Sequence, residues 1–264
     1  MSGREKVTCH RQAHCTKTNE SDFHAGEGYW STLPRMAPSL LCVTQVAPYL
    51  DGPAGVHGVL DQAATGVTQI AGMHDLKSRC VVDVRDVSPS QLRDTRVLAL
   101  FTIGETPFDA DQRRAILESV RSGRMSVLAI HSATDACYAW PEYGALVGGR
   151  FDGHPWTQTF TADVLDTAHP ACAHLGNEWR WHDEVYQFRD LRADAQVLLR
   201  VRPGELDLSA PGAREPAFGY PLAWCFNEGK GRVFSTSLGH FPLAWESPAY
   251  LRHLAGGLAW VLRS

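Results

Sequence analysis

Short apolar runs that alternate with helical patterns constrain the fold of this chain more than any other feature. The runs cover residues 39–46, 80–84, 96–103 and 125–130, and the last two are apolar almost throughout. A strand that reads as a continuous apolar run is typical of a parallel sheet covered on both faces. Strands that alternate with helices at these lengths indicate crossover units. The first half of the chain therefore predicts a doubly wound α/β sheet.

The helix after residue 108 has the clearest start signal in the chain. Asp109 can cap the first turn, and Gln112, three residues on, can reach back in a capping box. Gly123 is placed to end this helix. An earlier helix is expected at about 54–71. The apolar face of the helix after Asp109 is formed by Ile116, Leu117 and Val120.

The second half of the chain changes to antiparallel patterns. Residues 182–188 and 195–201 look like antiparallel strands, and residues 223–226 and 231–237 flank a turn at 227–230. Two strand patterns around such a turn predict a hairpin. We therefore expect antiparallel strands in the C-terminal half, added to a mostly parallel sheet.

A helix is predicted to close the chain. Ser247 can cap it, and Pro248 suits its first position. Gly256 and Gly257 lie inside the helix, where each glycine costs about 1 kcal/mol relative to alanine by helix propensity. The apolar stripe of this helix consists of Tyr250, Leu254, Leu258 and Val261.

Composition and charge exclude several classes of partner. The chain has 264 residues, 44% of them hydrophobic, which is enough for one large domain over residues 38–264. Its formal net charge is −4 and no basic stripe is present, so a nucleic-acid partner is not expected. No apolar run approaches the roughly 20 residues that a membrane span needs. The opening residues lack the apolar stretch of a signal peptide, so we expect a cytoplasmic protein.

The seven cysteines are scattered, which indicates reduced thiols in place of a disulfide framework. Cys9 and Cys15, with His10 and His14 between them, form a conceivable metal cluster, but their spacing fits no zinc pattern. We interpret residues 1–37 as a flexible N-terminal tail. The cysteines expected to act as small buried hydrophobic residues are Cys42, Cys80, Cys172 and Cys225.

Three stretches resemble one known family. Residues 129–156, 182–186 and 229–250 are similar to ThuA-like (trehalose-utilisation) proteins. The resemblance covers residues 96–262 well, whereas residues 39–95 match only in their alternation of strands and helices. It implies a glutamine amidotransferase-like, flavodoxin-like fold.

The resemblance also implies a sharp elbow after the strand that ends at residue 130. Class I amidotransferases carry a catalytic cysteine at this elbow and receive a histidine from a late strand. In this chain His131 stands at the elbow, and His240 falls where the late histidine would be. An imidazole cannot replace a thiolate in a thioester. Cys137 lies six residues on, on what is expected to be the next helix, so we predict no glutaminase activity.

Four side chains are the first candidates for chemistry: His131, His154, Glu184 and His240. Each lies at the end of a predicted strand or in a loop beside the elbow, where ligands bind in such sheets. Three imidazoles and a carboxylate suit zinc or a similar divalent ion. Their convergence rests on the resemblance and the assumed fold. A metal-free acid/base site and purely structural roles remain the alternatives, and no nucleotide cofactor is expected.

Two aspartates near these candidates have open roles. Asp135 follows His131 by four residues and could orient the imidazole in catalysis, or could equally cap a helix start. Asp183 and Glu184 are adjacent, so on a strand they point to opposite faces. We expect Glu184 to face the site, because Tyr186 then shares its face, and Asp183 to be a solvated surface carboxylate.

Aromatic residues are dense around the motifs, as in many carbohydrate sites. We expect Asp152, Trp156, Tyr186 and Phe241 to contact substrate, although buried aromatics commonly serve the core. Asp152 could instead satisfy the backbone of its turn. His57 is a further candidate after the first strand.

The leading interpretation is an enzyme of sugar or sugar-derivative metabolism. It would use acid/base chemistry in a histidine-rich pocket, with or without a divalent metal. The substrate would be a small molecule such as a polyol or keto-sugar, and the reaction an isomerisation, elimination or hydration. One alternative is a non-catalytic module that binds a carbohydrate or a partner. The other is an accessory biosynthetic enzyme with a non-sugar substrate. A homodimer is expected from size and class alone.

Overall fold

A computed structural model describes residues 40–50 and 58–263 of the chain. Contacts divide the chain into residues 1–36 and residues 37–264, and all described residues belong to the second unit. The expected tail at 1–37, the conceivable metal cluster around Cys9 and Cys15, and His57 lie outside the described residues.

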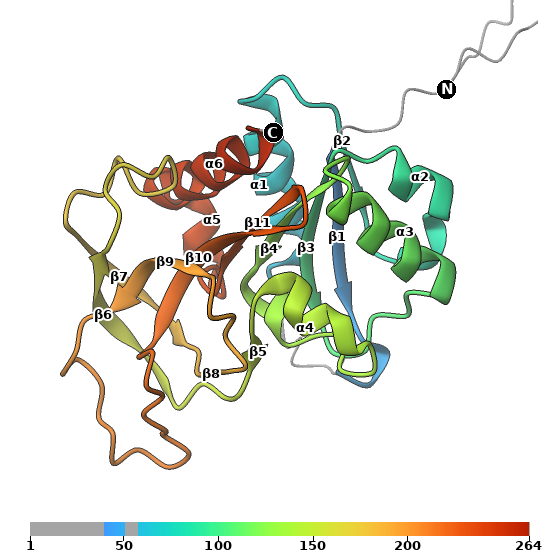
Figure 1. Cartoon of the computed structure of the whole chain (residues 1–264). Helices are drawn as coiled ribbons and strands as arrows, with labels where there is room; N and C mark the ends of the chain where they lie inside the picture. Colours follow the sequence, from blue (N-terminus) through green and yellow to red (C-terminus); the bar gives the residue numbers. More distant parts are fainter. Residues whose placement is uncertain (1–39, 51–57, 264) are drawn as a thin grey trace, which may run out of the picture. The chain divides into compact units, whose positions relative to one another are not determined.

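A nine-stranded sheet, in the order β2-β1-β3-β4-β11-β10-β9-β6-β7, forms the centre of the described residues (Figure 1). One half of it is parallel, as the apolar runs predict. Four of these strands are buried almost throughout, whereas the edge strand β2 is mostly half-buried. The parallel strands are β1 (Leu40–Val46), β2 (Ser78–Val81), β3 (Val97–Ile103), β4 (Ser126–Ile130) and β11 (Gly231–Thr236).

The other half of the sheet is antiparallel. It consists of β10 (Pro221–Glu228), β9 (Gln196–Val201), β6 (Trp156–Val164) and β7 (Glu178–Val185). The expected hairpin is confirmed as β10–β11, and the predicted fold class is confirmed with it. The strand β6 was not predicted. The expected strand 182–188 ends at Val185, and β8 (Phe188–Arg189) instead pairs with β5 (Arg150–Phe151).

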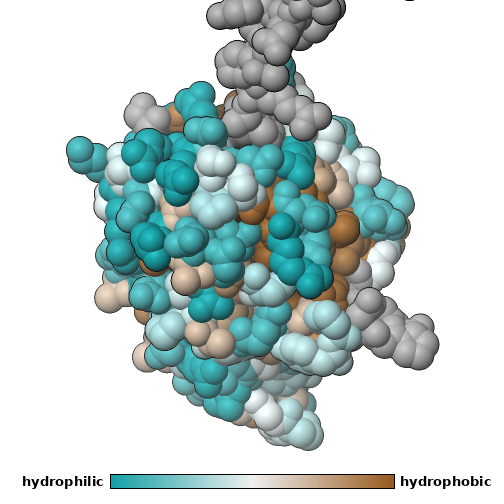
Figure 2. Space-filling model, turned by 90° about the vertical axis from the view of Figure 1, so that its right-hand side faces the viewer, coloured by the Kyte–Doolittle hydropathy of each residue, from teal (hydrophilic) through white to brown (hydrophobic). Residues whose placement is uncertain are grey.

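Helices cover both faces of the sheet because alternate strand residues point to opposite sides. In β1, Leu40 and Cys42 join one core, and Leu41 and Val43 join the other. The first core packs under α1 (Leu60–Gly72), α5 (Pro242–Glu246) and α6 (Pro248–Leu262). The second packs under α2 (Pro89–Arg93), α3 (Ala110–Arg121) and α4 (Pro141–Val147). Figure 2 shows the side of α2 and α3, which is mainly hydrophilic with a band of hydrophobic residues.

Local signals set the ends of several elements. The capping box at Asp109 and Gln112 is confirmed, and the Gln112 amide also donates to the carbonyls of Val84 and Val87. The expected strand 80–84 stops at Val81, because Asp83 caps the 3-10 turn η2 (Val84–Asp86). The predicted helix 54–71 is α1, which begins at Leu60. Ser247 caps α6 as predicted.

The cysteine interpretation is confirmed for three of the four residues. Cys42, Cys172 and Cys225 are buried, whereas Cys80 is partly exposed, and all four are free thiols. Within the described part of the chain, no helix is long and apolar enough to cross a membrane.

Helix propensity and packing make opposite predictions for Gly256 in α6. Propensity favours alanine by about 1 kcal/mol, but a Cβ at Gly256 would clash with the backbone of Pro170 and Ala171. We expect Gly256→Ala to lower the free energy of unfolding by about 1–3 kcal/mol, since rigid backbone cannot move aside. Urea unfolding measures this. Gly72→Ala is the matched control, because no atom lies within 4 Å of a Cβ there; a Gly256→Ala protein as stable as the wild type would refute the expectation.

Candidate functional site

His131 occupies a sharp elbow at the carboxyl end of β4. It begins the 3-10 turn η3 (His131–Thr134), with a φ of +49° in the left-handed region. A side chain other than glycine in this region costs on the order of 1–3 kcal/mol and persists only where surrounding structure enforces it. The side chain is buried, with a residue exposure of 1%. The elbow implied by the family resemblance is therefore present, with an imidazole at its apex.

A backbone carbonyl fixes the tautomer of His131. Its Nδ1 lies 2.7 Å from the carbonyl oxygen of Ser237, directly after β11. Because a carbonyl can only accept, Nδ1 carries the proton and the neutral ring has its lone pair on Nε2. The Tyr186 hydroxyl lies 3.0 Å from this Nε2 and can donate to it. Burial raises the pKa of Tyr186 well above its usual range, so the hydroxyl keeps its proton.

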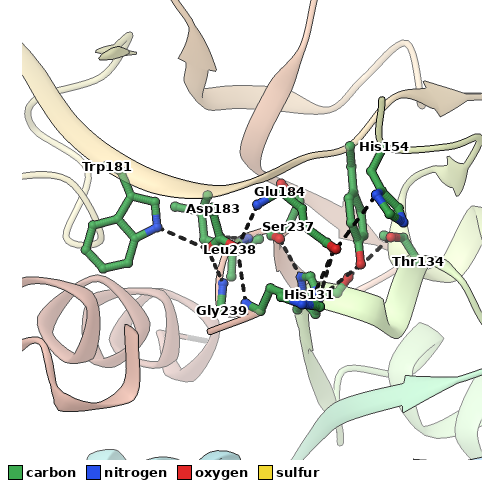
Figure 3. A network of polar contacts seen from close by, with 12 residues as sticks. His131, Thr134, His154, Trp181, Asp183, Glu184, Ser237, Leu238 and Gly239 are labelled. Atoms are coloured by element: carbon green, nitrogen blue, oxygen red, sulfur yellow. Dashed lines mark hydrogen bonds and ion pairs between the residues drawn. The ribbon is translucent and has the colours of Figure 1, made fainter. Parts of the chain in front are cut away.

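Two further side chains converge on Nε2 of His131. His240 Nδ1 lies 3.2 Å from His131 Nε2 and 3.2 Å from Glu184 Oε2. Glu184 Oε2 lies 3.8 Å from His131 Nε2. The side chains come from the ends of β4 and β7 and the loop after β11, and Figure 3 shows His131 and Glu184 facing each other. We call His131, Glu184 and His240 the cluster.

The cluster fits a divalent metal ion. Zinc binds nitrogen and oxygen ligands at about 2.0–2.1 Å, so two ligand atoms of a tetrahedral site lie about 3.3 Å apart. The three separations in the cluster are 3.2, 3.2 and 3.8 Å. A metal-binding histidine also commonly donates its other N–H to a carbonyl, as His131 does to Ser237. The donor set and its spacing therefore match one face of a tetrahedral site.

Glu184 and His240 form a charged pair. Burial disfavours the Glu184 carboxylate, but the hydrogen bond from His240 and the nearby imidazoles outweigh it and lower its pKa. Burial likewise disfavours the His240 cation, and the hydrogen bond and charge of Glu184, with Asp183, raise its pKa nonetheless. In the metal-free cluster, the pair therefore favours an imidazolium on His240 and a carboxylate on Glu184.

Asp183 is the clearest correction to the sequence analysis, because it is fully buried instead of solvated. Its carboxylate accepts N–H bonds from the backbone of Glu184, Gly239 and His240 and from the indole of Trp181 (Figure 3). Burial raises the pKa of Asp183 to about 6 against these donors, so it is ionised at neutral pH. It fastens β7 to the loop that carries His240.

The face prediction for β7 and Tyr186 holds. Glu184 and Tyr186 both reach His131, and Asp183 points to the opposite face. That opposite face is also buried, because α5 and α6 cover it. Alternation along the strand therefore placed Asp183 on the correct face, but could not show that this face is covered.

His154 and Asp135 lie beside the cluster, outside its three-atom triangle. His154 Nδ1 is 3.7 Å from Glu184 Oε1, and its side chain is 46% exposed. Asp135 accepts a 2.6 Å hydrogen bond from Tyr138, and burial, opposed by this bond, raises its pKa. The His131 ring is oriented by Ser237, where the sequence suggested Asp135. The expected helix after the elbow is also absent at Cys137, which lies in a loop before α4.

Of the four expected substrate contacts, the structure brings Tyr186 and Phe241 to the cluster. The Phe241 ring lies 4.7 Å from the His240 ring. Trp156 pairs with Val185, so it shares that residue's face of the sheet, opposite Glu184. Its indole packs on Tyr220 in the core.

Asp152 and Ser237 show two further limits of sequence reasoning. Asp152 forms an ion pair with Arg214 at 2.9 Å and no ion pair with a cluster residue within the described part of the chain. Ser237 was missed because it acts through its backbone carbonyl, which no side-chain pattern marks. Asp183 was named but misjudged, and its only signal was its position next to Glu184.

The chain is similar to a known protein family and to several solved structures. The family model ThuA, trehalose utilisation, matches residues 51–261, so the match begins well before residue 96. A ThuA-like protein from Bacteroides uniformis has 18% identity and a TM-score of 0.68, over 89% of this chain and 95% of that one. A ThuA-like protein from Parabacteroides merdae has 18% identity and a TM-score of 0.67, over 85% and 89%.

A cytoplasmic protein from Salmonella typhimurium is also similar, with 13% identity and a TM-score of 0.56 over 84% of this chain and 98% of that one. At these identities the solved structures show the fold alone. No curated protein matches the chain. With the family model matched over most of its length and the elbow in place, the chain belongs to the ThuA (trehalose utilisation) family and has its glutamine amidotransferase-like fold.

Proposed function

We propose that this protein is an enzyme of sugar or sugar-derivative metabolism. It moves protons next to a substrate carbonyl at the cluster, and holds a divalent ion there, zinc being the expected one. The observation that carries the proposal is the convergence of His131 Nε2, His240 Nδ1 and Glu184 Oε2, with the other nitrogen of His131 tied to Ser237. The description of the family, trehalose utilisation, supports the sugar substrate.

The residues of the site divide the chemical work. When bound, the ion would polarise a carbonyl or lower the pKa of a bound water to about 7. Tyr186 donates a hydrogen bond toward the centre of the cluster. His154, exposed on the outer side of Glu184, is in a position to exchange protons with solvent. These are the groups that isomerisation, elimination or hydration requires.

A groove beside the cluster supports a substrate with an apolar face. Its volume is about 540 Å³, and Phe241 forms a wall that it shares with the cluster, since its ring lies 4.7 Å from His240 and 5.3 Å from His182. Thr159 and Arg180 add polar groups to the lining. Aromatic walls with a few polar groups suit the C–H faces and hydroxyls of a sugar.

We also propose that the protein has no glutaminase activity. His131 occupies the elbow, and burial raises the pKa of the Cys137 thiol to about 11, which leaves it without thiolate character at neutral pH. We further propose a cytoplasmic location, supported by the similarity to the cytoplasmic protein from Salmonella typhimurium. A homodimer and the lack of a nucleotide cofactor belong to the proposal as well.

The first prediction concerns metal content. The purified protein should contain about one divalent ion per chain after loading with zinc, measured by mass spectrometry of the metal. His131→Ala, Glu184→Gln and His240→Ala should each lose it, because each removes one of three ligands. Asp183→Asn should keep the metal site but weaken its affinity for the ion about 10–100-fold. The NH₂ group of the asparagine would face backbone N–H donors, which cannot accept a hydrogen bond from it.

His182→Ala is the matched control for metal content, because His182 lies on β7 two residues before Glu184 and outside the cluster. It should retain the ion. If the wild-type protein takes up neither zinc nor manganese, the metal part of the proposal is wrong. Acid/base catalysis without an ion would then remain.

The second prediction concerns the proton-transfer step itself. In deuterated water, the protein should exchange a hydrogen beside the carbonyl of a keto-sugar drawn from a small panel, followed by NMR. His131→Ala should still bind the same sugar but lose the exchange at least about 100-fold, because it removes a ligand of the ion that polarises the carbonyl. A protein that binds a sugar equally well with and without His131, and exchanges no hydrogen, would be a binding module.

The third prediction concerns pH and the metal-free protein. The pKa of His240 is raised from 6.5, so its stabilising contribution is complete below that pH and is lost as pH rises through the folded value. The pKa of Glu184 is lowered from 4.5, so its contribution is complete above that pH and is lost as pH falls through the folded value. The free energy of unfolding lost in Glu184→Gln should therefore be largest between pH 4.5 and pH 6.5.

Urea unfolding in a chelator across this pH range measures the difference. Glu118→Gln, on the exposed side of α3, should show little change with pH. A loss in Glu184→Gln that stays constant from acid to alkaline pH would show that the pair with His240 does not form.

A further inference from the structure

A second cavity lies under the segment that joins β9 to β10. Residues 202–220 leave β9 after Val201 and return at Pro221, which pairs with Arg200 in the sheet. The cavity between this segment and the end of β9 has a volume of about 310 Å³. This volume lies at the lower end of the range for small-molecule sites. The cavity and the cluster share no lining residue.

Hydrogen bonds to the sheet give the covering segment a defined shape. The indole of Trp156 donates to the carbonyl of Asp207 at 2.9 Å. The amide of Gln158 donates to the carbonyl of Glu205, also at 2.9 Å. Near the end of the segment, the Tyr220 hydroxyl donates to the carbonyl of Arg214 at 2.6 Å. The wall of the cavity is therefore held at several points along its length.

Arg200 brings a positively charged side chain to this cavity. Its Nε is buried and has no hydrogen-bond partner among the residues that the structure describes. Arg202, two residues on, pairs with Asp163 and Glu178 at 2.8 and 2.7 Å. No such ion pair is formed by Arg200 within the described ranges. A buried N–H without an acceptor is unfavourable, and because Arg200 lines the cavity without an ion pair among the described residues, the rest of its guanidinium is available to an anion there.

Gly219 leaves space for the side chain of Arg200 beside the cavity. A Cβ at Gly219 would stand 3.3 Å from Arg200 Cδ, so the glycine accommodates the arginine stem. Glu215 also lines the cavity, but its side chain is exposed and is not within ion-pair distance of Arg200. The apolar part of the lining consists of Leu206, Leu208, Pro216, Phe218 and Tyr220.

We propose that this cavity is a second ligand site, which binds a small organic anion with an apolar body. The planar guanidinium of Arg200 would receive a carboxylate or phosphate head in a bidentate pair. The apolar lining would cover the body of the ligand. This site goes beyond the proposed function, which needs only the cluster and its groove.

Calorimetric titration of the full chain with three probes of the same body tests the proposal. Benzoate and phenyl phosphate should bind, and benzyl alcohol, which has no charge, should bind at least about tenfold more weakly. Comparison of the two anions separates a carboxylate ligand from a phosphate ligand. Arg200→Met should weaken both anions at least about tenfold, and Arg252→Met, on the exposed side of α6, should leave them unchanged.

Leu206→Trp provides a second variant that keeps Arg200 and fills the cavity, and it should also abolish anion binding. Thermal unfolding shows whether each variant is folded. The proposal is overturned if the folded wild type binds neither anion at millimolar concentration. It is equally overturned if either anion binds Arg200→Met and wild type alike, which would place the anion elsewhere, for example at a metal in the cluster.

Discussion

The buried carboxylate of Asp183 is the interaction on which the geometry of the cluster depends. It joins the edge strand β7 to the loop after β11 through the backbone N–H groups of Gly239 and His240. These two segments lie several strands apart in the sheet. Without this link, nothing in the sheet ladder would set the distance between Glu184 and His240. A buried carboxylate with four N–H donors can hold the two segments together stably, because each donor compensates part of the hydration that the charge lost on burial.

The elbow at His131 shows how a fold can retain strained geometry and change its chemistry. The left-handed backbone there places a side chain at the carboxyl end of the sheet, where ligands converge in open α/β folds. With an imidazole at this point, the available chemistry is proton transfer or metal binding. The carbonyl of Ser237 makes this use specific, because it holds the proton on Nδ1 and so directs the Nε2 lone pair of His131 toward the cluster.

Local signals were predictable wherever they depended on neighbours in sequence. The capping box at Asp109, the hairpin at β10–β11 and the face of Glu184 need only a few consecutive residues. Helix propensity misjudged the surroundings of Gly256, where backbone from a distant segment occupies the space of a side chain. Trp156 lies on the face opposite Glu184 for a similar reason, since its cross-strand partner in β7 decides its face.

The sequence by itself determined the parallel α/β core, the antiparallel second half and the identity of the histidines and carboxylate at the strand ends. These depend on periodicity, turn residues and motifs that are contiguous along the chain. Only the tertiary structure decided that Asp183 is a buried anchor, that a carbonyl orients His131, and that Arg200 has an unpaired N–H within the described residues. Burial and hydrogen-bond partners are properties of contacts between distant segments, so they exist only once the chain has folded.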